Sequence, residues 1–194
     1  LQGDWSSDVC SSDLPTATGN RLQAVLNQLS ASGDPRGVAP LLERFERAPE
    51  GEGRQFLQAL AQNHSGEAAV ALLRVLAGPE RIVHRAHNGP LTTRNYLPTL
   101  LLNLRGSEDE ILATFAGLPK DEWRLRAVLA PVLLGIASDR QDPALQQRCV
   151  DPLRAILFDQ AQVPQLRVLV LNHLTRRWLT IDDVLRLKAL RGTE

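Results

Sequence analysis

The sequence of 194 residues contains no methionine, only two cysteines and few aromatic residues, which make up 4% of the chain. Without a methionine the first residue is not an encoded start, so we expect a fragment or a processed product. A core poor in aromatic rings has to be built from aliphatic side chains, and leucine alone supplies 35 residues. Because leucine favours helices, the composition indicates an aliphatic and largely helical core.

Long hydrophobic runs are also absent. The longest, residues 127–137, has eleven residues and contains Pro131 and Gly135, whereas a helix needs about 20 apolar residues to span a bilayer. Basic and acidic side chains number 22 each, so the formal net charge is zero. These observations predict a soluble protein without a membrane segment.

The first residues differ in composition from the rest of the chain. Residues 4–14 read Asp-Trp-Ser-Ser-Asp-Val-Cys-Ser-Ser-Asp-Leu and closely resemble the conceptual translation of a sequencing-adaptor read, a known contaminant of assembled genomes. We therefore expect residues 1–14 to be a non-native, disordered leader, the alternative being a genuine Ser-rich arm. Without this leader the chain has 22 basic and 19 acidic side chains, a net charge of +3, and one cysteine.

That cysteine, Cys149, cannot form a disulfide within the chain. Its isolation favours a reducing compartment, and we expect a cytoplasmic protein. Between Arg148 and Val150 on a leucine-rich helix, it is more typical of a small buried hydrophobic residue than of a nucleophile, which needs a stabilised thiolate and access to substrate. We therefore expect no cysteine catalysis.

Large apolar residues recur with a fixed period near the start of the natural chain. A single constant shift in residue number, the one that moves Leu26 onto Leu57, places a first set of five apolar residues on a second set of five. These are Leu26, Leu29, Leu41, Leu42 and Phe45, followed by Leu57, Leu60, Leu72, Leu73 and Leu76. Spacings of three and four within each set are those of one helix face, and each period holds two such helices. The pattern predicts an α-solenoid, because a lone helix pair would leave its apolar stripe exposed to water.

The remainder of the chain can be divided in the same way. We expect an all-α fold of about five stacked antiparallel helix pairs in a single domain over residues 15–194, interrupted by a basic, irregular loop at 79–91. The expected pairs begin near residues 21, 53, 92, 121 and 164. The second helices have recognisable starts: Asp-Pro at Asp34 and Asp142, and a capping box from Ser107 to Glu110.

Residues 34–42 read Asp-Pro-Arg-Gly-Val-Ala-Pro-Leu-Leu. This segment resembles the second helix of HEAT repeats, which has the form Asp-Pro-x-x-Val-Pro-x-Leu-Leu, with the internal proline one place late. The resemblance extends over roughly Asn20 to Arg191. It implies a HEAT-like helical solenoid that presents a concave surface to a protein partner, but a shared fold carries no activity with it.

Two groups of residues are candidates for partner binding. The first is a ridge formed by the outward faces of the second helices, where Glu43 and Arg74 are equivalent positions one period apart. The ridge would comprise Glu43, Arg47, Arg74, Arg154 and Arg186. The second is the basic loop, whose candidates are Arg81, His84, Arg85 and His87; an inserted loop in a repeat protein often lies on the binding face. A tolerated loop without function is the alternative.

Catalytic and metal-binding patterns are not evident. His84 and His87 have the His-x-x-His spacing, but Arg81 and Arg85 would repel a cation and no third ligand lies nearby in sequence. The chain has no Gly-rich phosphate loop, no His-Glu-x-x-His and no Gly-x-Ser-x-Gly. We therefore expect neither enzymatic activity nor a cofactor.

Nucleic-acid binding is the alternative function. Five arginines near Trp123 and Trp178 suggest the HEAT-like DNA glycosylases; they are Arg124, Arg126, Arg167, Arg176 and Arg177. However, a net charge of +3 with interspersed acidic residues is a poor electrostatic footprint for nucleic acid. The sequence therefore favours a monomeric, non-enzymatic scaffold for a protein partner.

Overall fold

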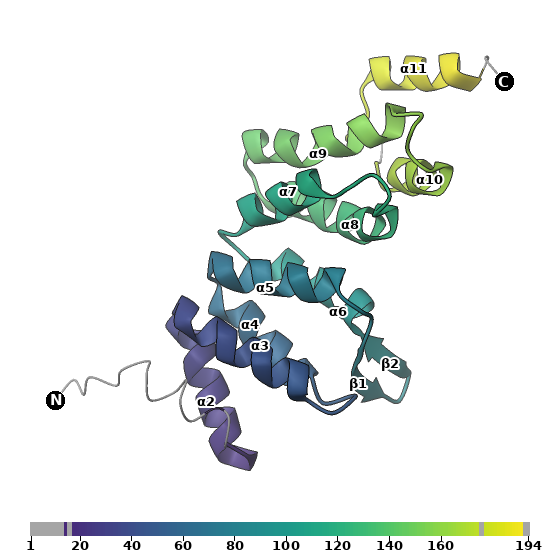
Figure 1. Cartoon of the computed structure of the whole chain (residues 1–194). Coiled ribbons are helices and arrows are strands. Elements are labelled where there is room, and N and C mark those ends of the chain that lie inside the picture. Colours follow the sequence, from purple (N-terminus) through teal and green to yellow (C-terminus); the bar gives the residue numbers. More distant parts are fainter. Residues whose placement is uncertain (1–13, 15–16, 175–176, 192–194) are drawn as a thin grey trace. The chain divides into compact units, whose positions relative to one another are not determined.

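The computed structural model describes residue 14 and residues 17–174 and 177–191, without the side chains of residues 190 and 191. It contains ten α-helices and one β-hairpin within this part of the chain (Figure 1). The prediction of a mainly helical protein is confirmed. None of the described helices is both long and apolar enough to cross a bilayer.

The chain divides into two compact units, residues 1–113 and 114–194. The expectation of one domain over residues 15–194 stays a prediction.

The first unit contains five complete helices and the start of a sixth. They are α2 (Gly19–Ser32), α3 (Val38–Arg47), α4 (Arg54–Asn63), α5 (Gly66–Ala77), α6 (Thr93–Asn103) and the first part of α7 (Glu108–Gly117). Helix α4 contacts both α2 and α6, while α3 contacts α5, so the helices form two layers (Figure 1). Contacts of α4 with α3 and α5 join the layers. Alternate helices along the chain therefore lie in the same layer.

Burial follows the period of the apolar residues. Four of the five matched pairs, beginning with Leu26 and Leu57, are at most 3% exposed at both positions. The fifth pair differs, because Leu73 is 4% exposed whereas Leu42 is half-buried. In both periods, residues at equivalent positions of the two helices therefore point into one largely aliphatic core.

Side-chain caps fix the starts of several helices. The carboxylate of Asp34 accepts from the N–H of Arg36 at 2.9 Å, just before the 3-10 turn η1 (Pro35–Gly37). Asp142 accepts from Ala144 N–H at 2.9 Å. Both Asp-Pro starts are confirmed.

The expected capping box at the start of α7 does not form. Ser107 Oγ and Glu110 Oε2 are buried without a hydrogen-bond partner in the described residues. The physical reason is that Glu110 lies against the start of α5, where a Cβ on Gly66 would be only 2.6 Å from its Oε1. The carboxylate therefore contacts a neighbouring helix and does not fold back onto its own.

The segment predicted as an irregular loop is an antiparallel β-hairpin, so this part of the prediction is wrong. Strands β1 (Ile82–Ala86) and β2 (Gly89–Thr92) pair His84 with Leu91 and Ala86 with Gly89. Gly89 has a φ of +114°, which favours glycine. Fully buried Val83 anchors the hairpin in the core. A β-branched pair followed by Asn-Gly was the sequence signal for this hairpin.

The expected leader also enters the structure at its last residue. Leu14 is fully buried, and the nearby Ala17 accepts a hydrogen bond from Arg44 Nη2 at 3.1 Å. Leu14 therefore belongs to the core of the first unit, while residues 1–13 lie outside the described part of the chain, and the expectation of a non-native, disordered leader over residues 1–14 stays a prediction.

The second unit continues from the end of α7 through four more helices. They are α8 (Trp123–Asp139), α9 (Pro143–Phe158), α10 (Pro164–His173) and α11 (Ile181–Arg191). Helices α8, α9 and α10 contact one another. Helix α11 is unusual, because it buries Asp183 while Ile181, the most exposed large apolar residue in the described chain, is 81% exposed. A polar interaction therefore holds α11 in place.

The difference in burial between Leu42 and Leu73 predicts a difference in stability. Leu73→Ala should lower the free energy of unfolding by about 2–5 kcal/mol, because it leaves a cavity in the core. Leu42→Ala should cost only about 1 kcal/mol, because half-exposed side chains lose less transfer free energy. Urea unfolding followed by circular dichroism measures both values. Equal losses would show that the two positions are equally buried and that Leu42 is not accessible from solvent.

Candidate functional site

Residue types associated with catalysis are scattered in the structure. No three His, Cys, Asp or Glu side chains of the described residues come together as a metal site. His84 lies in β1 and His87 in the turn after it. Cys149 is fully buried in α9. We therefore looked for a binding surface.

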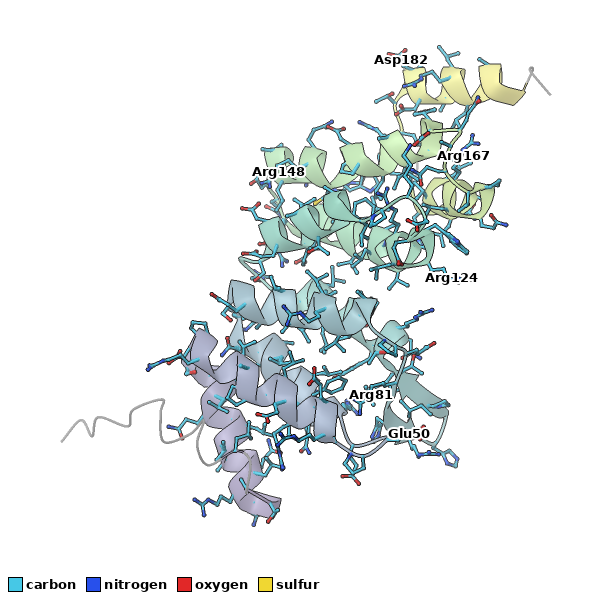
Figure 2. The ribbon with its side chains drawn as sticks, viewed as in Figure 1. Glu50, Arg81, Arg124, Arg148, Arg167 and Asp182 are labelled. Carbon is cyan, nitrogen blue, oxygen red and sulfur yellow. The ribbon has the colours of Figure 1, made fainter. Side chains whose placement is uncertain are left out.

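Arg81, a candidate of the basic loop, is a structural residue. Its Nη1 donates to the carbonyls of Phe45 and Glu46 at 3.3 Å each, and its Nη2 donates to the carbonyl of Ala48 at 3.1 Å. The guanidinium also lies 4.9 Å from the centroid of the Phe45 ring. Figure 2 shows Arg81 between the end of α3 and the hairpin. A cation that satisfies the last carbonyls of a helix also compensates the negative end of its dipole.

The other basic residues of the hairpin are more accessible. Arg85 forms an ion pair with Glu50, with 3.5 Å between Nη2 and Oε1, and its side chain remains 70% exposed. His84 is half-buried and His87 exposed. His84 lines a shallow polar pocket of about 320 Å³ that also contains Glu52. Acidic neighbours therefore offset part of the basic charge, and a binding role for these three residues stays a prediction.

The five candidates for the ridge belong to different units. Glu43 and Arg47 form an exposed ion pair on α3, with 2.6 Å between Oε1 and Nη2. Arg74 is exposed in the last turn of α5. Arg154 and Arg186 lie in the second unit, so the ridge divides into two groups that have to be considered separately.

Arg154 and Arg186 attach α11 to α9. Arg154 Nε donates to the carbonyl of Trp178 at 3.1 Å and lies 3.3 Å from Asp183 Oδ2. The Arg186 guanidinium lies 4.0 Å from the centroid of the Phe158 ring. Both arginines stabilise the second unit itself.

Asp183 is the buried partner in this cluster. Burial by itself would raise its pKa, but hydrogen bonds from the N–H and the hydroxyl of Thr180, together with the charges of Arg154 and Arg186, lower the pKa below the ordinary 3.8. The carboxylate therefore stays ionised and paired at neutral pH. This explains how α11 can bury an acidic residue.

The arginines considered for nucleic acid also contact their own chain. Arg126 donates to the carbonyl of Leu118, and Arg167 Nε donates to the carbonyl of Leu157 at 3.1 Å. Arg124 and Arg177 each lie over an adjacent tryptophan, at 5.2 and 4.7 Å from the ring centroids of Trp123 and Trp178. Arg176 lies outside the described residues. The four described positions therefore do not form a shared basic patch in which each guanidinium is open to phosphate.

A groove on the first unit is the strongest candidate site. It lies along α3 and α5 and has a volume of about 640 Å³. Its floor is apolar and includes Ala39, Leu42, Val70 and Ala71. Val70 is 43% exposed although it is a large apolar residue. The groove thus offers accessible apolar surface between two helices of the same layer.

Three charged residues border this apolar floor: Glu67, Arg74 and Glu110. Glu67 is in the first turn of α5 and Arg74 in the last turn. Glu110 comes from α7 and lies against Gly66, at the same end as Glu67. The groove therefore has an acidic end and a basic end.

Sequence reasoning found only part of this site. The ridge predicted from the sequence includes Arg74, and the spacing of Glu67, Val70, Ala71 and Arg74 along α5 is a helical stripe that marks the rest of that helix face. The sequence predicts Glu110 in a helix cap. Its position beside Gly66, which lies much earlier in the chain, depends on the packing of α7 against α5 and has no local signal.

The contacts of Arg81 predict a large effect on stability. Arg81→Ala should lower the free energy of unfolding by about 1–3 kcal/mol, because three carbonyls each lose one donor. Arg81→Lys should recover only part of this loss, since an ammonium lacks the planar fork of a guanidinium.

The matched control is Arg85→Ala, which removes an exposed ion pair of the same hairpin and should cost less than about 1 kcal/mol. Urea unfolding of the variants provides the comparison. Equal effects of Arg81→Ala and Arg85→Ala would contradict the structural role of Arg81.

Asp159 provides a prediction on pH dependence. The ammonium of Lys120, 2.8 Å from Oδ2, is the main cause that lowers the pKa of Asp159 from 3.8 to about 2, with further hydrogen bonds from Gln162 and Ala161. A lowered pKa means that the ionised carboxylate stabilises the folded state above about pH 4, and that this contribution is lost as the pH falls from 3.8 towards 2.

Lys120→Met should therefore move the pKa of Asp159 back towards 3.8, and the variant should lose stability relative to the parent at pH 6 but not at pH 2. NMR titration of the Asp159 carboxyl and unfolding at the two pH values measure this. An unchanged pKa in the variant would show that Lys120 is not the main cause.

Comparisons with protein-family models, with curated proteins and with solved structures found no match for this chain, so its function has to be inferred from the groove and from the packing around it.

Proposed function

We propose that this chain is a non-enzymatic protein-binding scaffold, a HEAT-like solenoid of five helix pairs that binds a protein partner along its second helices. Within the first unit, the contacts of α2 with α4, of α4 with α6 and of α3 with α5 are those expected of stacked helix pairs. In this proposal the chain acts as a monomer in the cytoplasm, in keeping with its single cysteine outside residues 1–14.

The observation that carries the proposal is the groove between α3 and α5. Aliphatic side chains in a soluble repeat protein are expected to be covered by the next helix pair, yet Val70 remains 43% exposed and Leu42 half-buried. Apolar surface of this kind, bordered by charges, is typical of a site for another protein. A partner helix placed in the groove would cover it.

Two further observations support a protein partner over nucleic acid. The arginines Arg126, Arg154 and Arg167 donate to backbone carbonyls of their own chain, which occupies N–H groups that would otherwise bind phosphates. The groove itself contains two carboxylates, Glu67 and Glu110, and these would repel a phosphate backbone.

Site-specific photocrosslinking tests the proposal. A benzoylphenylalanine introduced at Val70 would react with whatever occupies the groove, whereas the same residue at Gln28 would report the exposed side of α2 in the other layer. We expect position 70 alone to give a discrete protein adduct in a lysate of the source organism. Mass spectrometry would identify the adduct, and calorimetry with the purified partner would show weaker binding to Val70→Asp.

The same adducts at positions 70 and 28, or none at position 70, would refute the proposal. As a check on the alternative function, retention of duplex DNA that weakens steeply with salt would instead favour nucleic-acid binding.

A further inference from the structure

The acidic end of the groove contains a carboxylate oxygen without a partner. Glu110 Oε2 is buried and accepts no hydrogen bond from any described residue. Leaving a buried charged oxygen unsatisfied is costly, and a cationic group brought in by a ligand would remove the cost. Glu67 from the neighbouring helix lines the same groove and adds a second negative charge at this end.

The opposite end of the groove carries the opposite charge. Arg74 is seven residues after Glu67 on α5, and this separation corresponds to roughly 10 Å along a helix at 1.5 Å per residue. The apolar floor between them is formed by Leu42, Val70 and Ala71. A ligand that satisfies all three parts needs a basic group, an apolar stripe and an acidic group in that order, spread over about two helical turns.

We propose that the groove binds an amphipathic helix of the partner protein in one direction, antiparallel to α5. An Asp or Glu in the first turn of that helix pairs with Arg74, and a Lys or Arg about seven residues later pairs with Glu110 and Glu67. Its apolar residues between these charges cover Leu42 and Val70. This inference rests on the proposed function and names the chemistry of the partner.

Helix physics favours this direction. Acidic residues near the N-terminus and basic residues near the C-terminus stabilise the partner helix itself, because they compensate its dipole. The antiparallel arrangement also places the negative C-terminal end of the partner helix near the positive N-terminal end of α5. In addition, apolar residues at helical spacing between the two charges are the usual means by which a helix docks in a groove.

A synthetic helix can test the direction of binding. The probe is a peptide about four helical turns long, with glutamate at its third position, leucine at its sixth and seventh, lysine at its tenth, and alanine or glutamine elsewhere. A nitroxide spin label is attached at the C-terminus of the peptide, and the amide NMR signals of the protein are recorded with the peptide at up to millimolar concentration.

With the parent protein, we expect severalfold stronger broadening at Gly66 and Glu67 than at Arg74 and Ala77. Exchanging the two charges with Glu67→Arg and Arg74→Glu leaves the net charge unchanged and should abolish or reverse this difference, because only Glu110 remains negative at the original acidic end. In the matched control Glu43→Arg with Arg47→Glu, the exchanged ion pair lies outside the groove, so the direction should stay that of the parent. Circular dichroism confirms that each variant is folded.

Glu110→Gln provides a second test that leaves α5 intact, and it should reduce the difference in broadening between the two ends. Equal broadening at both ends in the parent, or no effect on α3 and α5 at millimolar peptide, would overturn the inference. The proposed function would still stand if photocrosslinking at Val70 gave a specific adduct, whereas loss of that adduct would refute the proposed function whatever the peptide shows.

Discussion

The structure depends on the burial of aliphatic stripes that no single helix pair can cover. Helix α4 shows this constraint most clearly, because it contacts α2, α3, α5 and α6, and its Leu57 and Leu60 are fully buried. Leu and Ala in such positions gain stability only when neighbouring helices exclude water from both sides. The period of the apolar residues and the layering of the first unit both follow from this requirement.

Arginine side chains also stabilise this fold. The chain has few aromatic residues and no methionine. Its guanidinium groups donate to carbonyls at helix ends and pack against the aromatic rings that are present. Arg81 does both at the C-terminal end of α3, and Arg154 anchors the start of α11 through Trp178 and Asp183. A high arginine content therefore reflects internal packing here as well as surface charge.

Burial is incomplete along the groove of the first unit. Leu42 and Val70 remain accessible while their neighbours Leu41 and Ala69 are fully buried, and Glu110 keeps a buried oxygen without a hydrogen bond. Under the proposed function, these local costs would serve partner binding. The groove combines an apolar floor with an acidic end and a basic end, whereas Glu43 and Arg47 on α3 form only an exposed ion pair.

The sequence by itself determined the helices, because spacings of three and four, Asp-Pro starts and proline positions act within one helix. It also determined most of the buried leucines in the first two periods, with half-buried Leu42 as the exception. Only the tertiary structure decided the other features. Val83 of the hairpin is buried in a core formed by other segments, and Arg81 donates to carbonyls at the end of α3. Glu110 lies against Gly66 of α5 and does not cap its own helix. These contacts join segments distant in sequence, so no local pattern of residues encodes them.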